Sequence, residues 1–336
     1  MKMMQEILDQ ADVLESLHNY LDTKKEILKK KINETNSVYL FGTGASLNAC
    51  YASVLPFVNM LSKKPIIIPA GEVNYYISLI KQNDLVIVVS QSGDSFETKF
   101  ICEQFVKNSI DFIGITNNET STLGKAATLV LLMHANDEVS SATKTYTAPV
   151  FIFYYLAMIN ESRSLLEDVY QKISIYQDQN TNYDLFVDEI AKYDKMYVLS
   201  DFLNYSTARA TALLLKEKDL ILAEPMTLSE FRHGAVEVID EGFLCLVILS
   251  ERNYLDEFNK HLNYLKTIKA NILCISSFDL DQLDKNRIIR VPELLNELYS
   301  PLIMTIPSQI ISALVAQKRG LDVDGFIHLN KIVSDY

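Results

Sequence analysis

The sequence contains few cysteines, and their spacing does not suit a metal. Four occur in 336 residues, each in largely apolar sequence: Cys50, Cys102, Cys245 and Cys274. None of the short intervals typical of metal-binding cysteines separates them. We therefore expect reduced cysteines in the core, no metal site and a cytoplasmic location.

Positive charge is also scarce. The chain has 31 Lys and Arg against 43 Asp and Glu, a formal net charge of −12. Nucleic acids and anionic membranes are bound by basic surfaces, so this balance argues against both as partners. A small anionic ligand is not excluded, because backbone amides and hydroxyl groups can bind an anion without a positive total charge.

The long apolar runs of exported and membrane proteins are missing as well. The N-terminus, MKMMQEILDQADVLESL, carries acids where a signal peptide has an apolar core. No run approaches the ~20 apolar residues of a membrane span. The apolar run over residues 150–158 predicts a buried helix, and residues 1–35 are expected to form an N-terminal helical segment.

What the chain does have is a series of short aliphatic runs that end in small residues. They form two sets of three, at residues 38–42, 86–90 and 112–116, and at residues 196–200, 246–250 and 272–276. Continuous hydrophobicity predicts parallel strands buried on both faces. Helix-length segments lie between the runs, so the pattern indicates βαβ units and a doubly wound α/β fold.

The two sets are similarly spaced, which indicates an internal duplication. Ser90 and Thr116 are 26 positions apart, as are Ser250 and Ser276. A polar stretch, QDQNTNY, separates the sets and reads as a linker. We expect one α/β domain over residues 36–178 and a degenerate copy over residues 184–336.

A loop rich in hydroxyl groups follows the run at 86–90. Its polar residues before the next helix include Ser90, Gln91, Ser92 and Ser95, with Gly93 among them. Ligands bind beyond the carboxyl ends of strands in such sheets, and the free amides of the next helix suit an anion. An ordinary helix N-cap remains the alternative for this loop alone. The corresponding loop of the second copy, SERNY, lacks the glycine and two of the serines, which favours one ligand site per chain.

A second small-residue loop, GTGASLN, follows the run at 38–42 and contains Gly44 and Ser46. Leu47 stands where a dinucleotide-binding fingerprint would have its third glycine, and no Walker-type lysine follows. Two small, hydroxyl-bearing loops at strand ends fit the phosphate monoester of a small molecule better than a dinucleotide.

These loops resemble a known family when three further segments are added: TKTYT at 143–147, EFRHGAVEVID at 230–240 and DVDGFIHLNKIV at 322–333. Together they resemble the SIS (sugar isomerase) family. The chain is similar to the isomerase half of glucosamine-6-phosphate synthase and to related phosphosugar deglycases and deaminases. The resemblance implies two flavodoxin-like SIS domains, no metal or organic cofactor, a hexose 6-phosphate substrate and a homodimer.

The resemblance also implies site residues. The phosphate and the nearby sugar hydroxyls are expected to contact Gly44, Ser46, Ser90, Gln91, Ser92, Ser95 and Thr143. Glu217 corresponds to the base that moves a proton between C1 and C2. His233 corresponds to the histidine that assists ring opening, reaching in from the neighbouring subunit, and Lys331 to the lysine that engages the carbonyl carbon. The residues alone leave three alternatives open: that Glu217 is a solvated acid, that His233 is a structural histidine, and that Lys331 is a solvated lysine of the C-terminal tail.

Two positions depart from the family pattern. Ala142 replaces a usual serine, and Leu214 stands where the synthase has a lysine. The chain begins MKMM, without the N-terminal cysteine nucleophile of a glutaminase domain. We therefore expect a phosphosugar isomerase or deaminase that acts on a keto- or amino-hexose 6-phosphate without a glutaminase domain. A deglycase of fructosamine 6-phosphates and a non-catalytic sugar-phosphate sensor remain as alternatives.

Overall fold

The computed structural model describes residues 1–240 and 243–328. The chain divides into two compact units. The N-terminal unit contains Asp9–Glu167 and the described residues from Phe326 on, and the C-terminal unit contains Met1–Leu8 and Asp168–Gly325. Helix α10, Ser164–Asp178, contains the boundary between them.

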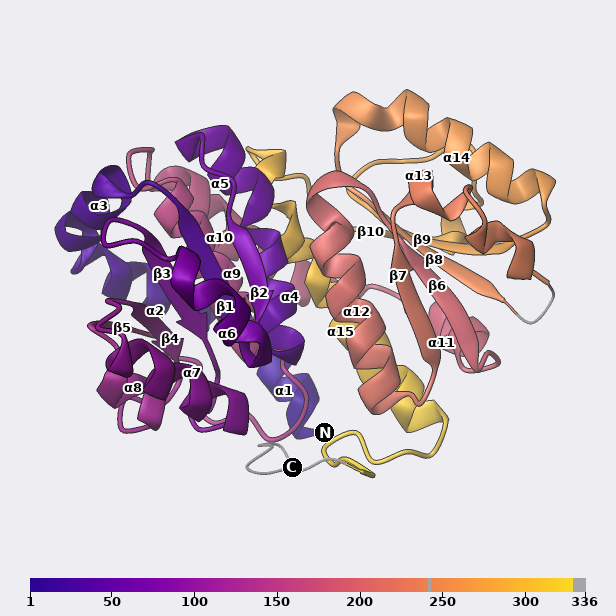
Figure 1. The fold of residues 1–336 in the computed structure, drawn as a ribbon. Helices are drawn as coiled ribbons and strands as arrows, with labels where there is room; N and C mark the ends of the chain where they lie inside the picture. Colours follow the sequence, from indigo (N-terminus) through magenta and orange to yellow (C-terminus); the bar gives the residue numbers. More distant parts are fainter. Residues whose placement is uncertain (241–242, 329–336) are drawn as a thin grey trace. The chain divides into compact units, whose positions relative to one another are not determined.

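The N-terminal unit is built on a five-stranded parallel sheet in the order β2-β1-β3-β4-β5 (Figure 1). Its strands are β1 (Val38–Gly42), β2 (Ile66–Pro69), β3 (Leu85–Val89), β4 (Ile113–Thr116) and β5 (Leu129–Leu132). Its helices are α2 (Gln10–Asp22), α3 (Lys25–Glu34), α4 (Gly44–Ala52), α5 (Val54–Leu61), α6 (Val73–Tyr76), α7 (Phe96–Lys107), α8 (Thr122–Ala126) and α9 (Lys144–Ala157). Every residue of α9 is buried, so the apolar run at 150–158 forms the predicted core helix.

The C-terminal unit has a second five-stranded parallel sheet, in the order β10-β9-β8-β6-β7. Its strands are β6 (Lys195–Leu199), β7 (Leu222–Met226), β8 (Leu244–Leu249), β9 (Asn271–Ser276) and β10 (Ile288–Arg290). Its helices are α1 (Lys2–Leu8), α11 (Asp184–Ile190), α12 (Tyr205–Lys218), α13 (Leu228–Phe231), α14 (Leu255–Thr267) and α15 (Ser300–Lys318). Helix α12 packs along α15 (Figure 1).

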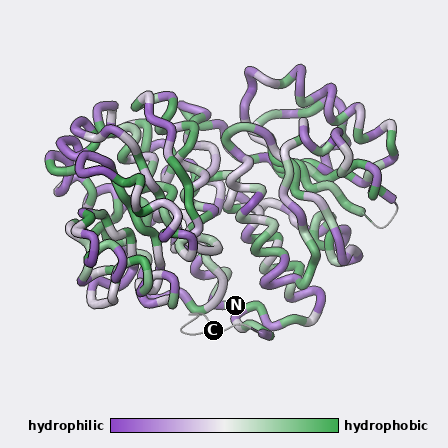
Figure 2. Tube along the Cα trace, viewed as in Figure 1, coloured by the Kyte–Doolittle hydropathy of each residue, from purple (hydrophilic) through white to green (hydrophobic). Residues whose placement is uncertain are grey.

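The two sheets confirm the predicted α/β fold with two related parallel sheets. Read from the β7 edge, the second order becomes β7-β6-β8-β9-β10, which matches the first strand for strand. The buried inner strands of both sheets lie in hydrophobic stretches of the chain (Figure 2). Strands β1, β3 and β8 are buried along their whole length, which explains their continuous aliphatic sequence.

Strands β2 and β7 are among the strands that the six aliphatic runs do not predict. Each lies at an edge of its sheet, pairs with one neighbour and is partly exposed. Each also contains a proline, Pro69 in β2 and Pro225 in β7. Proline is confined largely to edge strands because it cannot donate to the ladder, and an exposed face removes the need for continuous hydrophobicity.

One helical stretch corrects the expectation that no run reaches membrane-span length. Among the described residues, Glu297–Lys318 is long and apolar enough to cross a membrane by length and composition. However, 94% of its most apolar window is buried. The core helix of a soluble protein passes the same test, so the stretch is weak evidence for a span, and α15 packs as a core helix of its unit.

The end of α12 contains a buried acid. Asp219 has no exposed surface, and its Oδ2 accepts a 2.6 Å hydrogen bond from the Ser312 hydroxyl of α15. Burial raises the pKa of Asp219 to about 8, because it outweighs this hydrogen bond and the charges of Arg319 and Lys218. The folded protein therefore holds this proton more tightly than the unfolded chain does.

We predict that Asp219→Asn makes stability less sensitive to pH. The folded pKa is raised, so the stability that depends on this proton is present at low pH and is lost as the pH rises from about 4 to about 8. Relative to the wild type, the variant should gain roughly 1–3 kcal/mol in free energy of unfolding between pH 5 and pH 8.5. Urea unfolding measures this, with Asp281→Asn at an exposed position as the control. Parallel pH profiles for Asp219→Asn and the wild type would contradict the prediction.

Candidate functional site

The loop that joins β3 to α7 is tightly folded around its serines. The amide of Gly93 donates to Ser90 Oγ at 3.2 Å, and the amide of Asp94 donates to Ser92 Oγ at 3.3 Å. Ser95 is the N-cap of α7, and its Oγ accepts from the amide of Thr98 at 3.3 Å. The helix-cap interpretation therefore holds for Ser95. Ser90 and Ser92 instead shape the turn that leads to the helix.

Gly93 is the residue that permits this turn. Its φ is +70°, and a Cβ at this position would lie 2.0 Å from Ser121 Oγ and 2.6 Å from Ser121 Cβ. Both the backbone conformation and the close contact therefore require glycine.

The neighbouring β4–α8 turn holds the same loop in place. Both the amide of Thr122 (2.9 Å) and its hydroxyl (2.8 Å) donate to Asp94 Oδ1. The carbonyl of Gln91 accepts from Thr116 Oγ1 at 3.2 Å and from the amide of Asn117 at 3.0 Å. The hydrogen bond from the Thr122 amide lowers the pKa of Asp94, so this anchor is ionised at neutral pH.

The loop after β1 lies at the same edge of the sheet. Gly44 has a φ of +53°, and α4 begins there. The amide of Ser46 donates to the carbonyl of Thr43 at 3.0 Å, and Ser46 is partly exposed. Strands β1 and β3 are parallel neighbours, so their carboxyl ends meet. The structure thus places six of the seven predicted phosphate and sugar contacts, all but Thr143, on two adjacent loops.

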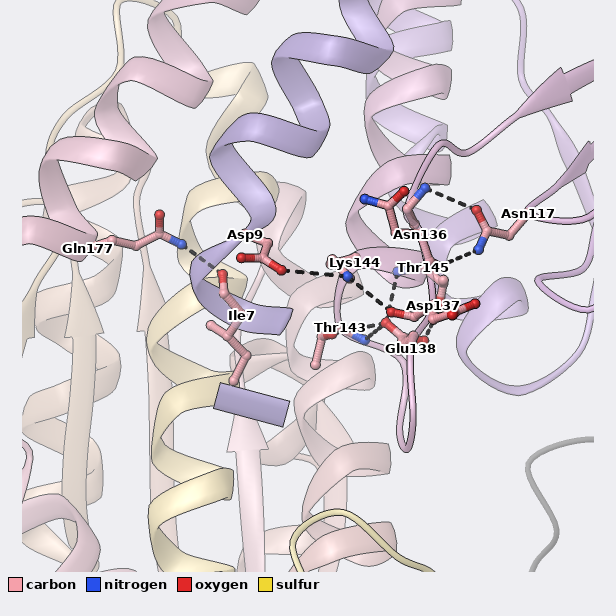
Figure 3. Close-up of polar contacts among 11 residues, drawn as sticks. Ile7, Asp9, Asn117, Asn136, Asp137, Glu138, Thr143, Lys144, Thr145 and Gln177 are labelled. Carbon is pink, nitrogen blue, oxygen red and sulfur yellow. Dashed lines mark hydrogen bonds and ion pairs between the residues drawn. The ribbon is translucent and has the colours of Figure 1, made fainter. Parts of the chain in front are cut away.

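Thr143 lies at the start of α9 in a cluster organised by Glu138 (Figure 3). Glu138 Oε1 accepts from the amide of Thr143 at 2.8 Å, from its hydroxyl at 2.9 Å and from the amide of Thr145 at 3.2 Å. The Thr145 hydroxyl donates to Glu138 Oε2. Both Thr143 and Glu138 are buried, so Glu138 is an internal hydrogen-bond acceptor at the N-terminus of α9.

Lys144 completes this cluster. Its ammonium donates to the carbonyl of Asp137 at 3.2 Å and lies 3.8 Å from the carboxylate of Asp9 (Figure 3). Its side chain is only 3% exposed. Lys144 therefore ties the segment before α9 to the start of α2, which makes it structural in this unit.

Glu217 lies in the last turn of α12 in the C-terminal unit and is partly buried. The two lysines beside it differ in exposure, because Lys216 is exposed whereas Lys218 is only 2% exposed. The ammonium group of Lys218 donates to the carbonyl of Gly325 at 2.5 Å. Burial lowers the pKa of Lys218. Glu217 is thus partly desolvated rather than a fully solvated acid between two exposed lysines.

His233 is exposed in the turn that follows α13. It lines an open pocket of about 360 Å³ together with Ser229, Arg232 and His261. Helix α13 is capped by Thr227, whose hydroxyl accepts from the amide of Glu230 at 3.2 Å. Lys331 lies outside the described residues.

Sequence reasoning missed Glu138 and Asp94 as residues that hold the site loops. In the sequence, each of these acids stands shortly before the start of a helix. Their hydrogen-bond partners, however, depend on the fold. Among the described residues, no three His, Cys, Asp or Glu side chains are grouped so that they could hold a metal.

The chain matches a known protein family along most of its length. The family model described as the SIS domain matches residues 31–159 and again residues 189–317. Each match contains one of the two sheets.

The chain is also similar to individual proteins. The chain is 28% identical over 342 aligned residues to glutamine–fructose-6-phosphate aminotransferase (isomerizing) of Aquifex aeolicus, covering 99% of this chain but 57% of that protein. The chain thus spans little more than half the length of this relative.

Solved structures share the fold. The C-terminal domain of glucosamine-fructose-6-phosphate aminotransferase from Francisella tularensis aligns with a TM-score of 0.84 and 19% identity, over 96% of this chain and 97% of that one. Glucosamine-6-phosphate deaminase from Thermotoga maritima aligns with a TM-score of 0.76 and 22% identity, over 99% of both chains.

We predict that Gly93→Ala destabilises the N-terminal unit. The new methyl group would collide with Ser121 while the backbone keeps a positive φ, so the free energy of unfolding should fall by roughly 1–3 kcal/mol. Gly71→Ala is the matched control, because a Cβ there would meet its nearest atom, Glu97 Cγ, at 3.8 Å. Denaturant unfolding compares the two variants. Equal stability in both would contradict the role assigned to Gly93.

Proposed function

Because this chain belongs to the SIS domain family, we propose that it is a phosphosugar isomerase or deaminase that acts on a keto- or amino-hexose 6-phosphate. The observation that carries the proposal is the pair of adjacent strand-end loops, after β1 and β3, in the N-terminal unit. They combine a glycine-permitted turn, several hydroxyl groups and the N-terminus of α7 at one edge of a parallel sheet. Such a site suits a phosphate monoester.

We assign the phosphate and the adjacent sugar hydroxyls to Gly44, Ser46, Ser90, Gln91, Ser92 and Ser95. Thr143 is assigned a sugar contact nearby, held in place by Glu138. The amides of the loop and the dipole of α7 supply the positive potential, so binding needs no lysine or arginine.

The chemistry is assigned to Glu217. Its carboxylate removes a proton from the carbon next to the carbonyl, and the same carboxyl group returns it to the neighbouring carbon of the enediol. With an amino sugar, the corresponding proton transfer gives an imine, which water hydrolyses with release of ammonia. Glu217 is partly buried, so its carboxyl group is not a fully solvated surface acid.

His233 is assigned to ring opening and Lys331 to contact with the carbonyl carbon. Imidazole can protonate the ring oxygen near neutral pH. The exposure of His233 is compatible with action in the site of a second subunit, so we propose a homodimer. The cytoplasmic location of the protein stays a prediction.

Two relatives bear on the reaction. One is named an isomerizing aminotransferase and the other a deaminase. We propose isomerisation or deamination because both reactions use the proton transfer assigned to Glu217.

We predict that Glu217→Gln slows turnover by roughly 10²–10⁴-fold with little change in KM, because the amide keeps the shape of the side chain but cannot carry the proton. Steady-state kinetics measures both constants. Glu103→Gln, at an exposed position of α7, is the control and should leave both unchanged. Unaltered turnover in Glu217→Gln would remove Glu217 from the mechanism.

The reaction itself is identified by incubation with a panel of hexose 6-phosphates, aminosugar phosphates and fructosamine phosphates, followed by mass spectrometry. We expect an isobaric product from a keto-hexose 6-phosphate, or release of ammonia from an amino-hexose 6-phosphate. Release of an amino acid from a fructosamine phosphate would instead make the protein a deglycase. Binding without turnover across the panel would make it a sensor.

A further inference from the structure

The C-terminal unit has an edge that corresponds to the proposed phosphate site. Because the two sheets share one strand order, Ser250 and Glu251 follow β8 as Ser90 and Gln91 follow β3. In the same way, Leu203 lies in the segment after β6 that leads into α12, as Ser46 lies after β1. The two edges can therefore be compared position by position.

A carboxylate of the chain itself occupies this edge. Glu251 Oε1 accepts from the amide of Leu203 at 3.0 Å. Its Oε2 accepts from the amide of Ser250 at 3.3 Å and from the hydroxyl of Ser250 at 3.0 Å. Glu251 is only 4% exposed. The donors after β6 and β8 thus converge on one internal carboxylate.

Other polar groups at this edge are also used internally. The fully buried Asn204 amide donates to Ser250 Oγ at 2.6 Å and to Ser300 Oγ at 3.0 Å, where α15 begins. Burial raises the pKa of Glu251 to about 7, against the hydrogen bonds from Ser250 and Leu203, which lower it. The carboxyl group is thus well removed from water.

The cavity lined by Ser250, the residue before Glu251, is too small for a sugar phosphate. The cavity at this edge has a volume of about 40 Å³ and is lined in part by Ser250, Arg252, Ser277 and Ser300. That is room for about one water molecule, whereas ligand pockets hold roughly 300–1,000 Å³. Arg252 is paired with Glu293, so its charge is already compensated.

We propose that the carboxyl group of Glu251 is an internal acceptor that fills, in the second repeat, the position that the substrate phosphate takes in the first, so that each chain binds one sugar phosphate. The statement about the first repeat rests on the proposed function. The statement about the second rests on the contacts of Glu251 alone. The sequence difference between the two loops follows: a loop that carries its own acceptor needs neither the glycine nor the extra serines.

The test replaces the internal acceptor with an external anion. In a background of Ser90→Ala and Ser92→Ala, which weakens the first site, Glu251→Ala leaves the donors of Leu203 and Ser250 without their acceptor. At pH 8, inorganic phosphate should then raise the melting temperature of Glu251→Ala by roughly 2–4 °C more than that of the background protein, with equal ionic strength in chloride as the reference. Glu251→Gln fills the same space and should show no added response.

Each outcome bears on one statement. An added phosphate response in Glu251→Ala but not in Glu251→Gln supports the proposal, even if the wild type fails to bind sugar phosphates and the proposed function is wrong. An equal response in the background protein and both variants overturns it and leaves the proposed function standing.

A second measurement applies if Glu251→Ala does not fold. Equilibrium dialysis of the wild-type chain against a labelled hexose 6-phosphate counts the bound molecules per chain. A value of one supports an internally filled second repeat, and a value of two overturns it.

Discussion

The amide groups at the start of each helix need an acceptor, and this requirement organises both units of the protein. In a doubly wound sheet these amides gather at the carboxyl edge, where the strands end. The chain supplies some of these acceptors itself: Ser95 for the Thr98 amide of α7, Asp94 and Ser121 for α8, Glu138 for α9, and Glu251 for the Leu203 amide before α12. A ligand anion can bind only to the amides that these internal acceptors leave available.

This requirement explains how a duplicated fold can serve a single substrate. The two sheets share their strand order, but the first repeat ends β3 with small hydroxyl-bearing residues and a glycine, and the second ends β8 with a buried acid. The first edge offers donors and a tight turn at Gly93, whereas the second is closed by Glu251, Asn204 and Ser300. Duplication thus supplies the framework, and divergence of one loop sets the number of sites.

The sequence predicts the fold well where the causes are local. Buried central strands such as β3 and β8 read as continuous aliphatic runs, while the edge strands β2 and β7 escape notice because exposure and proline weaken the pattern. The serine loop and Gly93 are predictable because strand, turn and helix are adjacent in sequence. Asp94 and Glu251 are not, because their partners Thr122 and Leu203 are distant in sequence. The roles of Glu217, His233 and Lys331 come from the family resemblance and remain proposals.

The central claim is that one edge of one sheet binds the phosphate of a sugar. A crystal structure of the chain with a bound hexose 6-phosphate tests it most directly. The account predicts phosphate oxygens within hydrogen-bonding distance of the loop from Ser90 to Ser95, with the carboxyl group of Glu251 still bonded to Leu203 and Ser250. A phosphate group beside Glu251, or a sugar phosphate bound away from both strand-end loops of the N-terminal unit, would contradict it.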